Sequence, residues 1–336
     1  DIRLVLLGLG TMVFIIVLFD ILLWRPLIAW SQKFRFDTVV SEDEPESFVL
    51  NILRKSTIQK WIIKQASSIN RSIERYFRQK EKKESYSPFK RFIKFFLIGS
   101  IFALLLWAAL KAINSLIALS INEYLTILKA AFFSLLRTGS AIVLALIWTV
   151  PLGVLIGFNR KVARVMQPVI QILASVPATA VFPVIILFLI RLGGGLDIGA
   201  IFLMLLGTQW YLLFNVIAGA SAIPNDLREA AGVYGIKGLR RWRVLIIPGI
   251  FPYLVTGLIT ATGGAWNATI VAEHVTFGGK TLTTIGLGSL ISEATVEGNY
   301  RLLLAGTITM AIIVVSINRL LWKRLFQIAK ERYRLE

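Results

Sequence analysis

Seven long apolar stretches limit what this chain can fold into. Each has about 20 residues, the length that an α-helix needs to cross a hydrocarbon core of about 30 Å. Because lipid offers the backbone no hydrogen-bond partner, such stretches cross a membrane as helices. With 56% apolar residues and a mean hydropathy of +0.72, the chain is predicted to be all-α, a polytopic transmembrane helical bundle. The expected spans are 4–23, 95–113, 138–158, 168–190, 198–222, 245–266 and 301–322.

The segment 114–137 interrupts this series with polar and charged residues. It contains Asn122, Glu123, Lys129 and Arg137. Charged side chains inside hydrocarbon are costly. We therefore expect this segment to be a helix at the membrane surface and not a span.

The net charge of +18 suggests nucleic acid as a partner, but its position along the chain argues against one. The segments 25–94, 159–165, 223–244 and 319–336 contain 30 of the 37 basic and 12 of the 19 acidic residues, and therefore the whole net charge. Basic residues concentrate in the cytosolic loops of membrane proteins. We expect these four segments, the C-terminal one included, to be cytosolic, with the lipid bilayer and no nucleic acid as partner.

Few residues are candidates for catalysis or metal binding. The sequence has no Cys and a single His, His274, which excludes thiolate zinc sites, cysteine nucleophiles and sites with several imidazoles. A phosphate-binding loop of the G-x-x-x-x-G-K-[ST] type is absent, because the GGK at 278–280 lacks the upstream glycine. We expect no catalytic residue, metal or cofactor in this chain, which is then not itself an enzyme.

A repeat links the two ends of the sequence. Residues 3–27 align with 301–325, and 12 of the 25 positions are identical, among them Arg3 with Arg301 and Trp24 with Trp322. Since unrelated Leu/Ile-rich spans do not place Arg, Met and Trp in register, we interpret 1–30 as the last transmembrane helix of an upstream copy. The segment 31–94 is then a cytosolic linker, and 95–336 is a complete second membrane domain of a tandem fusion.

The linker 31–94 is predicted to contain a basic amphipathic helix. Its apolar residues recur every three or four positions. Such a helix lies along an anionic membrane leaflet or packs on its own membrane domain; a regulatory partner site is the less favoured alternative. The apolar positions are Ile58, Ile62, Ala66, Ile69, Ile73 and Phe77.

The segment 224–248 differs from an ordinary loop between two spans. Pro224 and Asn225 end the preceding helix, and a short helix with small alanines follows. Gly235 and Gly238 then allow two sharp turns before a basic cluster. This pattern predicts a rigid cytosolic knob suited to transmit force between a membrane bundle and a soluble partner.

The same segment resembles the EAA signature of the permease subunits of ABC (ATP-binding cassette) importers. That signature reads EAA, three residues, G, nine residues, then I-x-L-P. The spacing matches in full, with Leu245 and Ile247 as conservative departures. The residues that carry the resemblance are Glu229, Ala230, Ala231, Gly235 and Pro248.

The resemblance implies a fold, a mechanism and partners. The fold is that of a type I ABC importer permease in the bacterial inner membrane, with the EAA loop cytosolic. The helix at Glu229 docks into a dimer of cytosolic ATPase subunits, which use ATP and Mg. The other implied partners are an extracytoplasmic solute-binding protein and a second permease copy, either fused upstream or a separate chain.

The resemblance covers about 132–322 and extends to a subgroup. The stretch 265–291, in which a Trp and a Glu precede a Gly-Leu-Gly, is similar to the nitrate, taurine/sulfonate and bicarbonate group. His274, Lys280 and the tandem organisation depart from the group. The implied substrate is a small solute or anion.

Polar residues within the expected spans are candidates for the translocation pathway. For the Ser and Thr residues, a hydrogen bond to a carbonyl of their own helix or between helices is the favoured alternative, and for Trp266 it is ordinary packing. The candidates are Ser175, Thr179, Gln209, Asn215, Trp266, Asn267 and Glu273.

The outer end of the span 245–266 carries further polar residues. We expect Glu273 and His274 to be a solvated loop pair; a pH-sensitive gate is the alternative. Arg137 and Arg191, near the outer face, are expected to attract anions. The glycines that follow suggest a tight docking segment for the binding protein, against a plain mobile loop; they are Gly278, Gly279, Gly286 and Gly288.

Two other classes of protein compete with an importer permease. A secondary transporter or channel needs no ATPase, but such proteins usually place ionisable residues deep in their spans, and here only Asp20 lies deep. A basic membrane-anchored scaffold acting through 31–94 would not need the segment 226–244. The EAA resemblance favours the importer.

Overall fold

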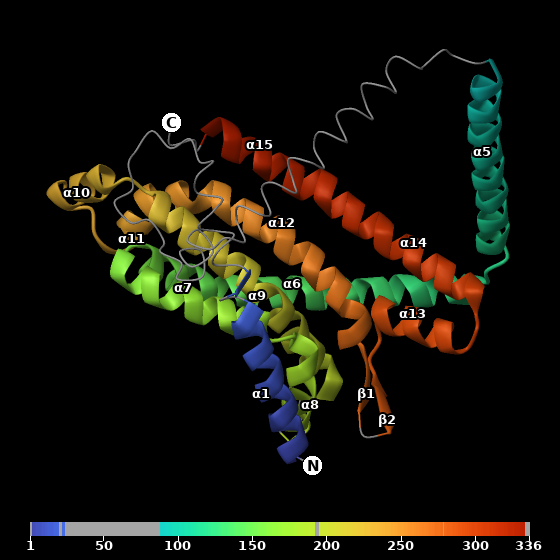
Figure 1. Ribbon diagram of the computed structural model, residues 1–336, viewed down its shortest axis with the longest axis horizontal. Coiled ribbons are helices and arrows are strands. Elements are labelled where there is room, and N and C mark those ends of the chain that lie inside the picture. Colours follow the sequence, from blue (N-terminus) through green and yellow to red (C-terminus); the bar gives the residue numbers. More distant parts are fainter. Residues whose placement is uncertain (1, 20–21, 24–87, 192–194, 278, 333–336) are drawn as a thin grey trace, which may run out of the picture. The chain divides into compact units, whose positions relative to one another are not determined.

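The computed structural model describes residues 2–19, 22–23, 88–191, 195–277 and 279–332 (Figure 1). Most of the predicted linker 31–94, including its amphipathic stripe, lies outside the described residues. The chain divides into two compact units, Asp1–Lys111 and Ala112–Glu336, which are treated separately below. The predicted linker boundary at 94/95 falls inside the first unit and stays a prediction.

The described residues of the first unit form α1 (Ile2–Phe19) and most of α5 (Pro88–Ile117). Nearly every described side chain of α5 is exposed, and most of them are large and apolar. The sequence repeat aligns α1 with α14 (Tyr300–Ile317). Both of the aligned segments are therefore helical.

The second unit is a helical bundle with one small hairpin. Its helices are α6 (Ile121–Gly157), α7 (Arg160–Ser175), α8 (Ala178–Arg191), α9 (Gly195–Ala222), α10 (Asn225–Val233), α11 (Gly238–Arg241), α12 (Ile247–Ala272), α13 (Leu287–Val296), α14 and α15 (Lys323–Arg332). The π-helical segments η3 (Trp242–Ile246) and η4 (Asn318–Trp322) lead into α12 and α15. β1 (His274–Phe277) pairs antiparallel with β2 (Lys280–Thr283).

Within the described residues, five helical segments are long and apolar enough to cross a membrane, or six if one bent pair counts as a span. The straight segments are Phe95–Ile117, Ile121–Gly157, Gly195–Ala222, Gly238–Ala272 and Tyr300–Arg332. The predicted polytopic all-α bundle is thereby confirmed. The expected span 4–23 corresponds to α1, whose described part is a shorter apolar helix.

The prediction of a separate surface helix at 114–137 is wrong. Residues 121–137 are the first part of α6, a single helix of 37 residues. Its polar residues have local uses, since Ser120 caps α6 and the carboxylate of Glu123 accepts hydrogen bonds from the backbone N–H and hydroxyl of Ser120. These residues mark the start of a long helix.

The expected span 168–190 is not one straight helix. It is split at Val176–Pro177 into α7 and α8, which are bent by 76° relative to each other. Proline lacks the backbone N–H that would continue the helix, and it disfavours a helical conformation in the residue before it. The pair is therefore a broken span or a re-entrant loop.

Close packing of α9 against α6 and α12 forms the core of the second unit. Small residues allow the approach, as is usual between membrane helices. Added Cβ atoms at Gly153 and Gly157 of α6 would overlap with α9 at Val216 and Ala220. At one end of these helices lie α10 and α11, and at the other lie the hairpin and α13 (Figure 1).

Gly157→Ala is predicted to destabilise the bundle. The new methyl group would lie 2.6 Å from the carbonyl oxygen of Ile217 and 2.7 Å from Cβ of Ala220, and overpacking of this kind costs about 1–3 kcal/mol. The thermal unfolding midpoint of the purified protein in nanodiscs should fall by several degrees. Gly207→Ala is the control, because a Cβ at Gly207 meets no atom within 4 Å; an equal midpoint in the two variants would contradict the packing described.

Candidate functional site

The connection between α9 and α12 contains the predicted knob. It consists of α10, a turn, α11 and η3. At the end of α10 the N–H of Tyr234 donates to the carbonyl of Ala230, and the N–H of Ile236 donates to that of Ala231. Gly235 has a φ of +65° and Gly238 a φ of +55°. Both turns expected from the sequence are therefore present, and both use backbone conformations that favour glycine.

The five residues of the EAA signature occupy distinct positions in this knob. Ala231 is buried and Ala230 is half-buried, whereas Glu229 is exposed. Gly235 makes the first turn, and Pro248 is in the first turn of α12, where a proline costs no helical hydrogen bond. The alanines fix α10 to the bundle, and the carboxylate of Glu229 is left on the outside.

Large apolar side chains are exposed on the same knob. Val233 is 86% exposed, Tyr234 79% and Leu239 88%. The same segment carries Lys237, Arg240 and Arg241, and it is not part of a long apolar helix face. An apolar surface of this kind is typical of a contact with another protein.

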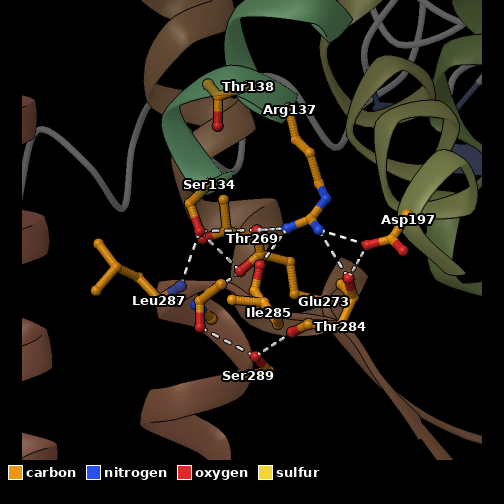
Figure 2. A network of polar contacts seen from close by, with 12 residues as sticks. Ser134, Arg137, Thr138, Asp197, Thr269, Glu273, Thr284, Ile285, Leu287 and Ser289 are labelled. Carbon is orange, nitrogen blue, oxygen red and sulfur yellow. Dashed lines mark hydrogen bonds and ion pairs between the residues drawn. The ribbon is translucent and has the colours of Figure 1, made fainter. Parts of the chain in front are cut away.

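The opposite end of the bundle contains a buried polar network around Glu273 (Figure 2). Glu273 follows the last residue of α12 and is fully buried. Its carboxylate accepts hydrogen bonds from the Ser134 hydroxyl at 2.7 and 2.9 Å and from the Gly288 N–H at 2.8 Å. It also forms an ion pair of 3.2 Å with Arg137. Burial raises the pKa of Glu273, and the hydrogen bonds and Arg137 oppose that shift.

Arg137 links three parts of the chain. One terminal nitrogen, Nη1, contacts Glu273 and donates to the Ile285 carbonyl at 2.7 Å. The other, Nη2, donates to the Thr284 hydroxyl at 2.7 Å and forms an ion pair of 2.6 Å with Asp197 in the first turn of α9. Figure 2 shows the guanidinium between the two carboxylates. The base of the hairpin is thus fixed to α6 and α9.

Two predictions about this region are wrong. Glu273 is not part of a solvated loop pair, because it is buried and paired. Arg137 is 5% exposed, and its two terminal nitrogens already contact protein oxygens, so it is not free to attract anions from solution. The partners of Glu273 are distant in sequence, Arg137 by 136 residues, and no local pattern indicated the network.

The glycines after the hairpin are parts of a packed structure. A Cβ at Gly286 would overlap with the Glu273 carboxylate, and one at Gly288 would overlap with the backbone of Thr269. Both glycines are buried, and Gly279 has a φ of +76° in the hairpin turn. Gly286 and Gly288 therefore belong to a tight segment. The role of this segment in docking stays a prediction.

The candidate pathway residues are spread over several helices. Two of them donate hydrogen bonds to backbone carbonyls of their own helix. The Ser175 hydroxyl donates to the Gln171 carbonyl at 2.7 Å, and the Asn215 amide donates to the Tyr211 carbonyl at 2.8 Å. Trp266 is buried in an apolar cluster with Leu287 and Leu290. The remaining positions are Gln209, which is buried, and Thr179 and Asn267, which are exposed.

Two cavities lie at other positions. One, of about 470 Å³, is at the network end and is lined by Asp197, Thr284, Ser289 and Glu293, among others. The second, of about 590 Å³, lies along an apolar face of α6 between Phe132 and Leu144. None of the seven pathway candidates lines either of them.

Glu273→Gln is predicted to destabilise the protein far more than Asp197→Asn. The first change leaves Arg137 facing a neutral amide in a fully buried site, and breaking a buried pair costs about 3–5 kcal/mol. The side chain of Asp197 is 75% exposed, and pairs near solvent contribute about 0–1 kcal/mol. Thermal unfolding of both variants in nanodiscs would measure the difference; equal losses would contradict the importance of the buried pair.

Comparison with known proteins places most of these elements in one family model. The model "binding-protein-dependent transport system inner membrane component" matches residues 149–322. A putative ABC transporter permease of Methanocaldococcus jannaschii is 29% identical over 58% of this chain and 69% of the relative. A nitrate import permease of Leptolyngbya laminosa is 29% identical over 56% of this chain and 63% of the relative. A bicarbonate transport system permease of Synechococcus elongatus is 28% identical over 57% of this chain and 64% of the relative.

The chain thus spans a little under two thirds of the nitrate and bicarbonate relatives. Among solved structures, this chain is similar to a chain of the inward-facing MetNI methionine ABC transporter, with a TM-score of 0.51 and 21% sequence identity. The superposition includes 63% of this chain and 99% of the MetNI chain. At that identity the likeness concerns the fold alone.

Proposed function

This chain belongs to the family of binding-protein-dependent transport system inner membrane components, and we propose that it is the permease subunit of an ATP-driven importer, coupled to its ATPase through 224–248. One observation carries the proposal. The knob at α10 has exposed apolar residues and an exposed Glu229, and it lies where α6 and α9 end and α12 begins. A soluble partner that holds this knob can move three core helices together.

The proposed cycle uses the two ends of the bundle differently. Two cytosolic ATPase subunits bind the knobs of two permease copies. When the ATPase subunits close on ATP, the paired membrane domains change from the inward-facing to the outward-facing state. A binding protein delivers solute at the end that carries the hairpin and α13, and hydrolysis resets the cycle. ATP and Mg belong to the partner ATPase, and no cofactor is assigned to this chain.

The charge at the knob end supports the orientation. Arg160, Arg228 and Arg241 gather there around Phe158, although they come from two loops. Basic residues favour the cytosolic side of a bacterial inner membrane. The knob and the C-terminal segment are therefore assigned to the cytosol, and the hairpin end to the outside.

The proposed solute is a small anion of the nitrate, sulfonate or bicarbonate type. The support comes from relatives named for nitrate and bicarbonate. Gln209 and Asn267 are the pathway residues that we favour, because neither side-chain amide makes a hydrogen bond within the described residues and each needs several partners. Ser175, Thr179, Asn215 and Trp266 are weaker candidates, and so is Glu273, because its carboxylate is already paired with Ser134 and Arg137.

The second permease copy is proposed to lie upstream in the same polypeptide. The support is the identity of 12 of 25 residues between 3–27 and 301–325, together with the helical conformation of both α1 and α14. The fused order would place both knobs on one polypeptide.

Glu229→Lys is predicted to abolish binding of the ATPase. The change reverses the charge at the exposed carboxylate of the knob without altering its buried alanines. Co-purification of the ATPase from membranes measures binding. Glu297→Lys is the control, because Glu297 is exposed at the other end of the bundle; a Glu229→Lys complex that keeps its ATPase and its uptake would refute the proposed coupling.

Uptake into proteoliposomes is predicted to need ATP and to survive collapse of ion gradients. The complete transporter, with its ATPase and binding protein, is reconstituted and supplied with labelled nitrate, bicarbonate or a sulfonate. A secondary transporter or channel would give the opposite dependence. Uptake that continues without ATP and stops with an ionophore would establish that alternative.

A further inference from the structure

Arg228 precedes Glu229 in α10 and points the other way. Glu229 is exposed, whereas Arg228 is half-buried and reaches back into the bundle. Its Nη2 donates to the Ala220 carbonyl at 2.6 Å, and its Nη1 donates to the Phe158 carbonyl at 3.3 Å. Neighbouring residues of one short helix thus face the expected partner and the membrane domain.

The two carbonyls that Arg228 binds belong to the ends of two core helices. Phe158 is the C-cap of α6, and Ala220 is in the last turn of α9. Carbonyls at a helix C-terminus have no partner within the helix and carry the negative end of the helix dipole. A guanidinium has a planar fork of donors that can bind two such groups at once. Arg228 therefore binds α10 to the ends of both α6 and α9.

The aromatic ring of Phe158 adds a second contact. The guanidinium carbon of Arg228 lies 4.3 Å from the ring centroid, and that of Arg241 lies 5.5 Å from it. Burial, with Arg160 and Arg241 nearby, lowers the pKa of Arg228. Because these like charges repel one another, placing them together destabilises the folded protein. An apolar residue would fill the space without that cost, so the arrangement favours a role that needs the two directional hydrogen bonds.

The ends of α6 and α9 form one rigid support for Arg228. Gly157 lets the two backbones approach so closely that an added methyl group would overlap with Ala220. Next to it, the Ser221 hydroxyl donates to the Gly157 carbonyl at 3.1 Å. A displacement of α10 that acts through Arg228 would therefore reach both helices together.

We propose that Arg228 is a positioning residue that fixes α10 to the C-terminal ends of α6 and α9, so that movement of the knob is transmitted to the core. The fixing of α10 is a property of this chain alone. The transmission of movement rests on the proposed function. The two parts are therefore tested by separate measurements.

Hydrogen–deuterium exchange of the full chain in nanodiscs tests the fixing of α10. In Arg228→Gln the amides of 225–233 should exchange at least about tenfold faster, while those of α9 and α12 stay unchanged, because the local opening of α10 is no longer opposed. In Arg228→Lys the exchange rate of these amides should lie between that of the unaltered chain and that of Arg228→Gln, since one ammonium group does not reproduce the planar fork of donors of a guanidinium. Arg240→Gln removes an equal charge from an exposed side chain of the same loop and should leave exchange of 225–233 unchanged.

Transport per ATP in the reconstituted complex tests the transmission. Arg228→Gln should keep its ATPase bound and lower the amount of solute moved per ATP at least about fivefold. Phe158→Leu keeps the backbone carbonyl and removes only the ring, so it should lower the amount of solute moved per ATP by less. It is also the variant to measure if Arg228→Gln folds poorly.

Two results would overturn the proposal. The first is unchanged exchange at 225–233 in Arg228→Gln, which would mean that the contact does not hold α10. The second is faster exchange with an unchanged ratio of solute to ATP, which would mean that movement travels by another route, such as Ile223 against Gly249. Failure of the proposed function is distinguishable, because it would appear as an ATPase retained by Glu229→Lys.

Discussion

The approach of α6 to α9 at Gly153 and Gly157 is the constraint on which the other features depend. A methyl group at either position would overlap with α9, so the two helices pack more closely here than residues with a Cβ would allow. This contact sets the ends of the helices side by side. Arg228 can bind both carbonyls only because Phe158 and Ala220 are neighbours there. The second core contact, between α9 and α12, relies in the same way on Gly219 against Tyr253 and Gly257 against Asn215.

Local features of this chain were predictable from the sequence, and features made by distant residues were not. The long apolar stretches predicted the fold class, and the glycines at 235 and 238 predicted the turns, because both depend on a few consecutive residues. Glu123 and Arg137 misled the prediction for 114–137. One is used in a helix cap and the other in an ion pair, and neither use is visible in hydropathy. The partners of Glu273 lie as far as 139 residues away.

The knob shows how sequence neighbours can have unrelated surroundings. Glu229 is exposed, as the family signature suggested, whereas Arg228 is directed at the ends of two helices. The signature combines exposed, buried and turn-forming residues, and it does not include Arg228. A residue that faces inward is identified by its contacts, and Arg228 therefore became visible only in three dimensions.

The ion pair between Arg137 and Glu273 also has a consequence for biosynthesis. The ribosome adds roughly 5–20 residues per second, and 136 residues separate the two partners. Arg137 thus leaves the ribosome before both of its carboxylate partners, since Asp197 follows it by 60 residues and Glu273 comes later still. During that interval α6 carries an uncompensated cation, which a membrane tolerates near its surface but not at its centre. The buried pair can form only once the end of α12 has been made, so α6 and α12 are joined at this point late in synthesis.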